Sequence, residues 1–347
     1  MSLYERLASL EIEVERYRLE RRAVVVGRDF ERVTTTVVLE GGGLAGRGED
    51  TGYTAADHDG WPEGLPLAGR RTLDDFSRAL DGLTLFPRPP QADKAPRHRR
   101  WALESAALDL ALRQAGRSLG EALGLPVRPV RFVVSTRDDI RPWLAADPAL
   151  EFKLDPTPEW TRDLMEAYAA TGRVRVLDLK GWYEGLEVGQ PPDTALYAAV
   201  AGIFPDALIE DPAWTDATAA ALAGAEGRLS WDAPVGSLAD LDALPVEPRN
   251  LNVKPSRFGV LSRLLACVDA CRERGIQCYG GGQFELGVGR ENVQALASVF
   301  YAHGPNDVAP SDYNVGGARR GLPRSPLPPP AGPGLGGNAE TIQPAAP

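Results

Sequence analysis

The chain has 347 residues and a formal net charge of −10 at pH 7, with 43% hydrophobic and 25% charged residues. Such a composition is typical of a soluble globular protein, and the length predicts about two domains. The acidic balance lacks a compensating basic stretch, which argues against a general nucleic-acid or anionic-membrane binder. Neither a signal pattern nor an apolar stretch of transmembrane length is found, so we expect a cytoplasmic protein.

Residues 1–125 are predicted to form an α+β domain. Alternating or β-branched runs predict three strands, at 10–15, 33–39 and 46–49. Thr72-Leu73-Asp74-Asp75 resembles a capping box that begins a helix. Apolar residues at helical spacing predict a long helix over 101–123, which ends at Gly124.

Short apolar runs alternate with helical stretches from about residue 130 onward. Eight runs are expected strands: 130–135, 150–154, 174–179, 207–209, 228–231, 250–253, 276–280 and 307–309. The expected helices between them are 140–146, 159–170, 194–204, 215–223, 238–244, 258–274 and 290–303. This count predicts a (β/α) barrel over residues 126–320. A doubly wound open sheet is the alternative, but no glycine-rich phosphate loop follows the first strand.

Three consecutive strands of this predicted barrel each end in a carboxylate. These are Asp178, Glu210 and Asp232. Catalytic groups of such barrels stand at the C-terminal ends of the strands, and neighbouring strands lie about 5 Å apart. The three side chains are therefore expected to converge on one hard cation. Oxygen ligands favour Mg²⁺, with Mn²⁺ as the alternative ion. A helix cap or a surface charge is the alternative interpretation for each acid taken alone.

Lysine is rare in this chain, and its positions are informative. Only four of the 38 basic residues are lysines, namely Lys94, Lys153, Lys180 and Lys254. The last three end strand-like runs. Arginine stays protonated in proteins, whereas lysine can lose its proton, so this placement indicates amines that exchange a proton. Chance placement in an arginine-rich chain is the alternative.

Five short motifs in a fixed order resemble those of one known family. They are Gly46-Arg47-Gly48-Glu49, Ala106-Ala107-Leu108-Asp109-Leu110, Ile209-Glu210-Asp211-Pro212, Asn252-Val253-Lys254-Pro255-Ser256-Arg257-Phe258-Gly259 and Pro333-Gly334-Leu335-Gly336. On these motifs the chain resembles the enolase superfamily, in its mandelate racemase / muconate-lactonizing branch, over almost its whole length. The resemblance implies an α/β fold, a (β/α)7β TIM-like barrel with an α+β N-terminal capping domain.

The resemblance also implies a chemistry. Asp178, Glu210 and Asp232 would be Mg²⁺ ligands, and Lys254 would be the acid/base that removes a proton α to a carboxylate and gives an enediolate. The Pro/Gly-rich segment 321–347 reads as a disordered tail by composition, but the resemblance implies that it returns to the capping domain. Members of the family commonly assemble, so a homo-oligomer is expected.

Three positions depart from the family pattern. Lys153-Leu154-Asp155 stands where the family has Lys-x-Lys, Lys180 stands where it often has Asn, and Ala233 stands where it often has Glu. Either Lys180 replaces the missing amine, or Asp155 takes part in proton transfer, or Lys153 and Lys180 serve as cationic partners. We favour the last, with Lys254 as the single base. One base suits an elimination, whereas racemisation needs a base on each face.

Four further residues are candidates for substrate binding. Glu285 follows the seventh expected strand, with helix capping as the alternative role. By resemblance, Tyr53, His58 and Trp61 belong to a loop that folds over the barrel mouth, where they select the substrate or merely pack the loop.

The sequence therefore predicts a Mg²⁺-dependent lyase or isomerase that acts on a small-molecule carboxylate. One alternative is a metal-free aldolase, in which a lysine forms a Schiff base with a carbonyl. The other is a member of the superfamily that has lost catalysis and only binds a ligand. The altered second-strand motif is the observation that supports this last alternative.

Overall fold

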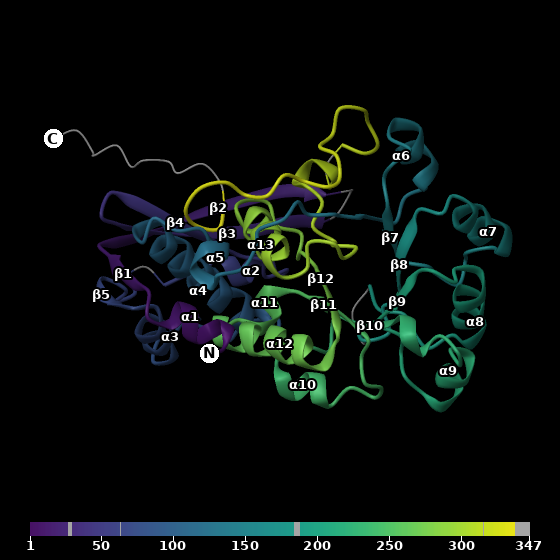
Figure 1. The fold of residues 1–347 in the computed structure, drawn as a ribbon, viewed down its shortest axis with the longest axis horizontal. Helices are drawn as coiled ribbons and strands as arrows, with labels where there is room; N and C mark the ends of the chain where they lie inside the picture. Colours follow the sequence, from purple (N-terminus) through teal and green to yellow (C-terminus); the bar gives the residue numbers. More distant parts are fainter. Residues whose placement is uncertain (27–29, 63, 184–187, 315, 337–347) are drawn as a thin grey trace.

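The computed structural model describes all residues except 27–29, 63, 184–187, 315 and 337–347 (Figure 1). It has an N-terminal part built on antiparallel strands and a larger part built on a parallel sheet. Helices α7 (Arg162–Ala170), α8 (Thr194–Ile203) and α9 (Asp216–Ala221) cover the strands farthest from the N-terminal part. The arrangement is the α/β barrel with an α+β cap that the sequence predicts.

The N-terminal part contains two antiparallel sheets. One has the order β2 (Arg16–Val26), β3 (Phe30–Gly41), β4 (Leu44–Asp50), and the other pairs β1 (Glu11–Val14) with β5 (Gly69–Thr72). The helices of this part are α1 (Leu3–Ala8), α2 (Ala55–His58), α3 (Leu73–Asp81), α4 (Ala95–Gln114) and α5 (Leu119–Leu123). The helix expected over 101–123 is therefore two helices, and α5 begins at its own capping box on Ser118.

The glycines of the Gly46-Arg47-Gly48-Glu49 motif let β4 lie directly on the backbone of α4. A Cβ on Gly46 would collide with the Ala106 carbonyl, and one on Gly48 would collide with the Ala102 carbonyl. Only glycine permits so close an approach of two backbones. Glu49 then accepts hydrogen bonds from the backbone N–H groups of Leu286 (2.9 Å) and Gly289 (2.7 Å), which ties the cap to the barrel.

The parallel sheet has seven strands in sequential order. They are β6 (Val134–Thr136), β7 (Phe152–Leu154), β8 (Val174–Asp178), β9 (Leu208–Glu210), β10 (Leu229–Trp231), β11 (Asn250–Val253) and β12 (Gln277–Gly280). Besides α7, α8 and α9, the connecting helices are α6 (Ile140–Ala146), α10 (Leu238–Asp242), α11 (Pro255–Phe258), α12 (Leu261–Arg274) and α13 (Gly289–Phe300), with 3₁₀ turns at Glu226–Arg228 and Ser311–Tyr313. A sequential order is that of a barrel and not of a doubly wound sheet.

The expected eighth strand at 307–309 is not formed, and two single bridges take its place. Asn306 bridges to Phe132 ahead of β6, and Asp307 bridges to Gly281 after β12. The fully buried Asn306 side chain adds bonds to the backbone bonds of these two bridges. Its amide donates to the Arg131 carbonyl (2.8 Å), and its oxygen accepts from the Gly280 N–H (2.6 Å). One side chain thus joins the two edges of the sheet.

Replacing Asn306 with alanine is expected to lower the free energy of unfolding by about 2–4 kcal/mol, because buried backbone groups on both edges lose their partners. Urea denaturation measures the change. The matched control is Asn250→Ala, since among the described residues the half-buried Asn250 amide bonds just the carbonyls of Gly227 and Leu229. Equal losses for the two variants would contradict the closing role of Asn306.

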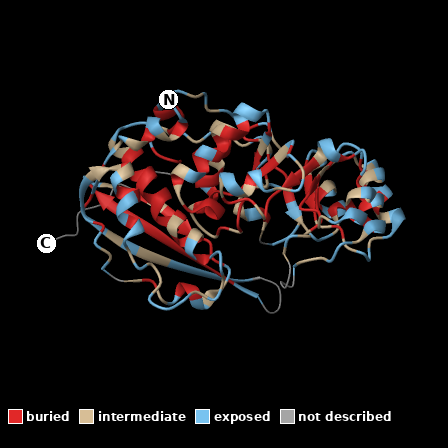
Figure 2. Cartoon of the chain, turned by 90° about the horizontal axis from the view of Figure 1, so that it is seen from below, coloured by how far each residue is buried: buried red, intermediate tan, exposed pale blue. Residues whose placement is uncertain are grey.

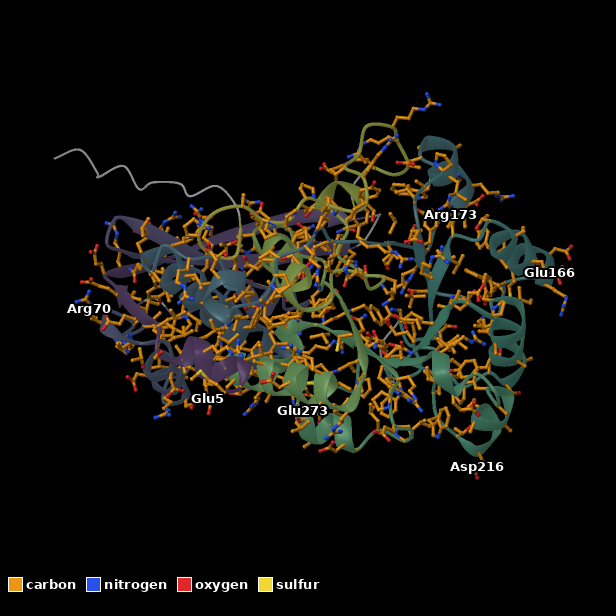
Figure 3. All side chains as sticks on the ribbon, viewed as in Figure 1. Glu5, Arg70, Glu166, Arg173, Asp216 and Glu273 are labelled. Atoms are coloured by element: carbon orange, nitrogen blue, oxygen red, sulfur yellow. The ribbon has the colours of Figure 1, made fainter. Side chains whose placement is uncertain are left out.

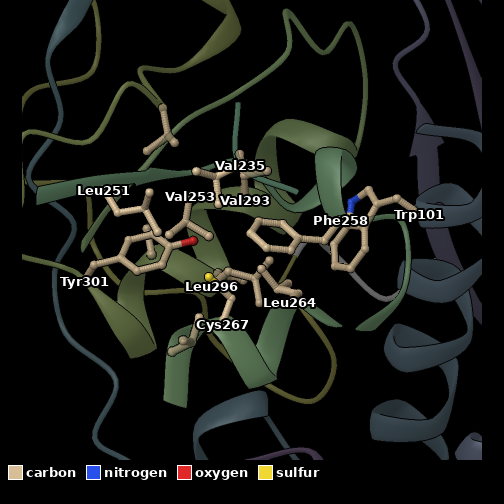
Figure 4. Close-up of a cluster of buried hydrophobic side chains, with 14 of the residues drawn as sticks. Trp101, Val235, Leu251, Val253, Phe258, Leu264, Cys267, Val293, Leu296 and Tyr301 are labelled. Atoms are coloured by element: carbon tan, nitrogen blue, oxygen red, sulfur yellow. The ribbon is translucent and has the colours of Figure 1, made fainter. Parts of the chain in front are cut away.

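Buried residues fill the inner layers of both parts, and exposed residues lie on the outer faces (Figure 2). One hydrophobic cluster runs across the boundary between the parts, where Trp101 of α4 lies beside Phe258 of α11 (Figure 4). Charged side chains such as Glu166, Asp216 and Glu273 project outward from the barrel helices (Figure 3). Within the described part of the chain, no helix combines the length and apolar character needed to cross a bilayer.

The last described residues lie against the cap. Gly334 bridges to Ser118, and the Leu335 N–H donates to Asp109 Oδ1 at 2.8 Å. The Arg113 guanidinium donates to the Gly336 carbonyl at 2.6 Å. Asp109, which belongs to the motif Ala106-Ala107-Leu108-Asp109-Leu110, therefore binds the backbone of the motif Pro333-Gly334-Leu335-Gly336. Residues 337–347 of the expected tail lie outside the described residues.

Candidate metal and proton-transfer site

Three carboxylates meet at the C-terminal end of the parallel sheet. Asp178 ends β8, Glu210 ends β9, and Asp232 directly follows β10. Asp178 and Glu210 are register partners, and Glu210 is paired with Ser230 of β10. All three side chains are fully buried, and one oxygen from each lies within 4.8 Å of the others. The convergence expected from the strand ends is therefore present.

The three rim lysines all contact this cluster. Lys153 Nζ lies 3.1 Å from Asp178 Oδ2, contacts Glu210 Oε1, and lies 3.7 Å from an Asp307 oxygen. Lys254 Nζ contacts a single carboxylate of the cluster, with 2.9 Å to Asp232 Oδ2.

Lys180 approaches the first carboxylate from another side. Its Nζ contacts Asp178 Oδ2 and lies 3.5 Å from Asp155 Oδ1. The backbone of Lys180 has φ +54°, a left-handed conformation that costs free energy in a non-glycine residue. Asp155 also pairs with Arg137 at 2.9 Å. The structure therefore places Lys180 and Asp155 as an ion pair beside the cluster.

The three carboxylates differ in their ionisation. Burial opposes the charge of Asp178, but Lys180 and Lys153 hold the pKa of its carboxyl well below its usual range. Burial raises the pKa of Glu210 to about 8; Lys153 opposes this rise and the nearby Asp178 reinforces it. Glu210 is thus the carboxyl that a bound cation would most help to ionise.

Glu210 also accepts hydrogen bonds from two side chains of the barrel interior. Asn252 Nδ2 donates to Glu210 Oε2 at 3.1 Å, and the Tyr279 hydroxyl donates to the same oxygen. Asn252 belongs to the Asn-x-Lys motif and was open to prediction. Tyr279 was missed, because only its inward position on β12 distinguishes it from an ordinary core tyrosine.

Arg257 secures the third carboxylate. Its Nη2 lies 3.1 Å from Asp232 Oδ2 and 2.9 Å from the Tyr183 hydroxyl, and its Nη1 donates to the Ala233 carbonyl at 3.0 Å. Burial opposes ionisation of Asp232, yet Arg257 and Lys254 hold the pKa of its carboxyl well below its usual range. Arg257 lies three residues after Lys254 within a motif, but its role was not predicted.

Asp211 positions the third carboxylate through the backbone. The backbone of Asp211 has φ +49°. Its side chain turns toward the neighbouring strand, where it accepts hydrogen bonds from the N–H groups of Asp232 (2.7 Å) and Ala233 (2.8 Å). Burial, reinforced by Asp232 and Asp178, raises the pKa of Asp211 to about 7. Its position between Glu210 and Pro212 gave no signal of this role.

Asp211→Asn is expected to weaken Mg²⁺ binding about tenfold without removing a ligand, because the amide cannot accept both backbone N–H groups. Isothermal titration measures the affinity. Asp216→Asn, at the exposed first turn of α9, is the matched control and should leave the affinity unchanged. An Asp211→Asn variant that binds like the control would show that the two backbone bonds do not orient Asp232.

Glu285 and Tyr53, two of the expected substrate-binding residues, each lie against an arginine. Glu285 Oε2 lies 2.8 Å from Arg290, and its other oxygen accepts the Gln283 N–H. Tyr53 is 47% exposed and its ring stacks on Arg32.

Two of the expected residues are packed inside the cap. His58 is buried, with one ring nitrogen 3.0 Å from Thr35 Oγ1 and the other 2.9 Å from the Gly52 carbonyl. Trp61 is also buried and stacks on Arg99. Both side chains contact residues of the cap, and their part in substrate selection stays a prediction.

The residues of the carboxylate cluster fit a divalent ion. Three buried carboxylates supply hard oxygen ligands, the set that Mg²⁺ prefers. Asp232 Oδ1 is buried, and the Arg257 Nε lies 3.1 Å from it without the geometry of a hydrogen bond. This oxygen therefore retains hydrogen-bonding capacity that a metal ion can use.

Comparisons with known proteins agree with the fold. Two family models match the chain, the N-terminal domain of a domain of unknown function (DUF8230) over residues 5–122 and its C-terminal domain over residues 126–315. A solved enolase-superfamily member from Listeria innocua is 19% identical, with 86% of each chain covered and a TM-score of 0.62. A dipeptide epimerase from Methylococcus capsulatus, solved with a Mg ion, is 17% identical, with 94% of this chain and 99% of that chain covered and a TM-score of 0.63.

One curated protein shows a local likeness in sequence. It is o-succinylbenzoate synthase of Bacillus subtilis (strain 168), which is 39% identical over 61 residues. The match spans 18% of this chain and 16% of that protein.

Proposed function

Because the chain belongs to the family described as domain of unknown function DUF8230 and has the enolase-superfamily fold, we propose that it is a Mg²⁺-dependent enzyme that removes a proton α to a carboxylate of a small molecule. The observation that carries the proposal is the cluster of Asp178, Glu210 and Asp232 at three neighbouring strand ends, with lysine amines against it. A divalent ion bound there supplies positive charge where negative charge develops as the proton leaves.

The contacts of the three lysines support different roles for them. Lys153 Nζ contacts three carboxylates and Lys180 Nζ contacts two, so both are fixed as cationic partners. Lys254 Nζ contacts only Asp232 among the described carboxylates, which makes it the amine most able to turn toward a substrate. We assign Lys254 as the group that accepts the proton at Nζ. A single base favours an elimination, and hence a lyase over a racemase.

The experiment is proton exchange in D₂O. The protein is incubated with Mg²⁺ and a panel of small carboxylic acids, and proton NMR follows loss of the α-proton and formation of product. Exchange that stops when EDTA removes the metal is the expected result. Mg²⁺ binding without exchange of any acid in the panel would favour the alternative of a ligand-binding member without catalysis. Absence of Mg²⁺ binding would overturn the proposal.

A Schiff-base aldolase is the other candidate, and the lysine contacts speak against it. Such an enzyme needs a neutral amine. Burial opposes the charge of Lys153 and of Lys180, but the carboxylates beside them hold the pKa of both amines well above its ordinary value. The three carboxylates gathered at the strand ends also have no role in metal-free carbonyl chemistry. Borohydride reduction in the presence of a keto acid, followed by mass spectrometry, should leave all three lysines unmodified.

A further inference from the structure

A cavity of about 770 Å³ opens at the end of the barrel opposite the carboxylate cluster. Its lining includes the residues that begin strands β9, β11 and β12, namely Leu208, Asn250 and Gln277, together with Arg175 near the start of β8. The carboxylates of the cluster stand at the other ends of the same strands. The cavity therefore opens on the other side of the barrel from the carboxylates, and Tyr279 is a lining residue that also contacts Glu210.

Arginine dominates the charge of this cavity. Four arginines line it, Arg128, Arg131, Arg175 and Arg272, whereas Asp206 is the only acidic residue in the lining. This local excess of positive charge stands out on a chain whose net charge is −10.

One half-buried acid, Glu151, holds two of these arginines in place. Its oxygens lie 2.6 Å from Arg131 Nε and 2.6 Å from Arg175 Nε. Burial opposes the charge of Glu151, but Arg131 and Arg175 hold the pKa of its carboxyl below the usual value. One carboxylate thus orients two guanidinium groups and compensates only one of their charges.

The other two arginines remain available to a ligand. Arg128 and Arg272 are exposed, and neither forms an ion pair with any residue in the described part of the chain. Guanidinium groups match phosphate and carboxylate oxygens in a two-pronged geometry, which makes arginine the preferred residue for such anions.

The cavity also offers apolar surface. Val268, Phe300 and Tyr301 line it beside the arginines, and its volume lies in the range of small-molecule sites, about 300–1,000 Å³. We propose that this cavity binds a small polyanion that carries phosphate or carboxylate groups, at a site distinct from the metal cluster.

The test is isothermal titration of metal-free protein with pyrophosphate and, separately, with citrate, which distinguishes phosphate from carboxylate ligands. The variant is Arg128→Gln with Arg272→Gln, chosen because these exposed side chains form no ion pair in the described structure and their loss should not impair folding. Arg162→Gln on α7 is the matched control, since its side chain is 73% exposed and pairs only with Glu166.

We expect at least one of the two anions to bind the wild-type protein, and the double variant to bind it about tenfold or more weakly. The Arg162→Gln control should bind as the wild type does. Binding that is equal in the double variant and the wild type would place the anion elsewhere, for example at the rim lysines, and would overturn the proposal. Absence of binding of both anions would overturn it as well.

Discussion

Asp232→Asn should weaken Mg²⁺ binding by about 100-fold or more. The substitution replaces one of the three clustered carboxylates with a neutral amide, so a bound ion would lose one of its anionic ligands. It also leaves Arg257 and Lys254 without the carboxylate that they share, and two uncompensated cations repel an incoming metal ion. Isothermal titration with Mg²⁺ measures the affinity directly and needs no substrate.

The control for this variant is Asp163→Asn, which neutralises an exposed aspartate in the first turn of α7. It changes the net charge by the same amount, so it corrects for any long-range effect of charge. Circular dichroism should show that both variants fold. If Asp232→Asn bound Mg²⁺ as tightly as Asp163→Asn, the carboxylate cluster would not be a metal site.

Lys254→Met should reduce α-proton exchange by about 10³-fold or more, because it removes the proposed proton acceptor while keeping an apolar stem of similar length. The Mg²⁺ affinity should move in the other direction. Lys254 Nζ lies 2.9 Å from Asp232 Oδ2, so the loss of its positive charge makes the cluster more negative and strengthens metal binding. The two readouts, NMR exchange and Mg²⁺ titration, therefore separate a base from a residue that only supports the fold.

The conservative variant Lys254→Arg completes the comparison. It keeps the positive charge beside Asp232 but supplies a group that does not lose its proton. We expect exchange to be lost and the Mg²⁺ affinity to stay near that of the wild type. Exchange activity in either variant would show that another group accepts the proton, and Lys180 is then the next residue to replace.

The carboxylate cluster was predictable because it depends on a regular feature of the chain. Parallel strands end at one edge of the sheet, so acids at the ends of three consecutive strands must meet there. Asp178, Glu210 and Asp232 were found in this way, and Lys254 follows the same rule one strand later.

The supporting residues were less accessible to sequence reasoning. Asp211 acts through a left-handed backbone turn, and Tyr279 reaches Glu210 from across the barrel. Neither contact has a local signature in the sequence. The helix expected over 258–274 begins only at Leu261, after the separate short helix α11. Gly259 follows α11 with φ +72°, and an added Cβ there would lie 2.9 Å from the Cα of Arg97 in the cap, so both the backbone turn and the close approach require glycine.

The position of Asn306 has a wider meaning for this barrel. Seven strands form a continuous ribbon from β6 to β12, and its two margins are fastened mainly by one amide group and two single bridges. Curvature of the ribbon and closure of the ring are therefore separate properties here. A change of this side chain removes the amide bonds but leaves the backbone bonds of the two bridges, so closure of the ring can be weakened at one position while every strand pair of the ribbon stays intact.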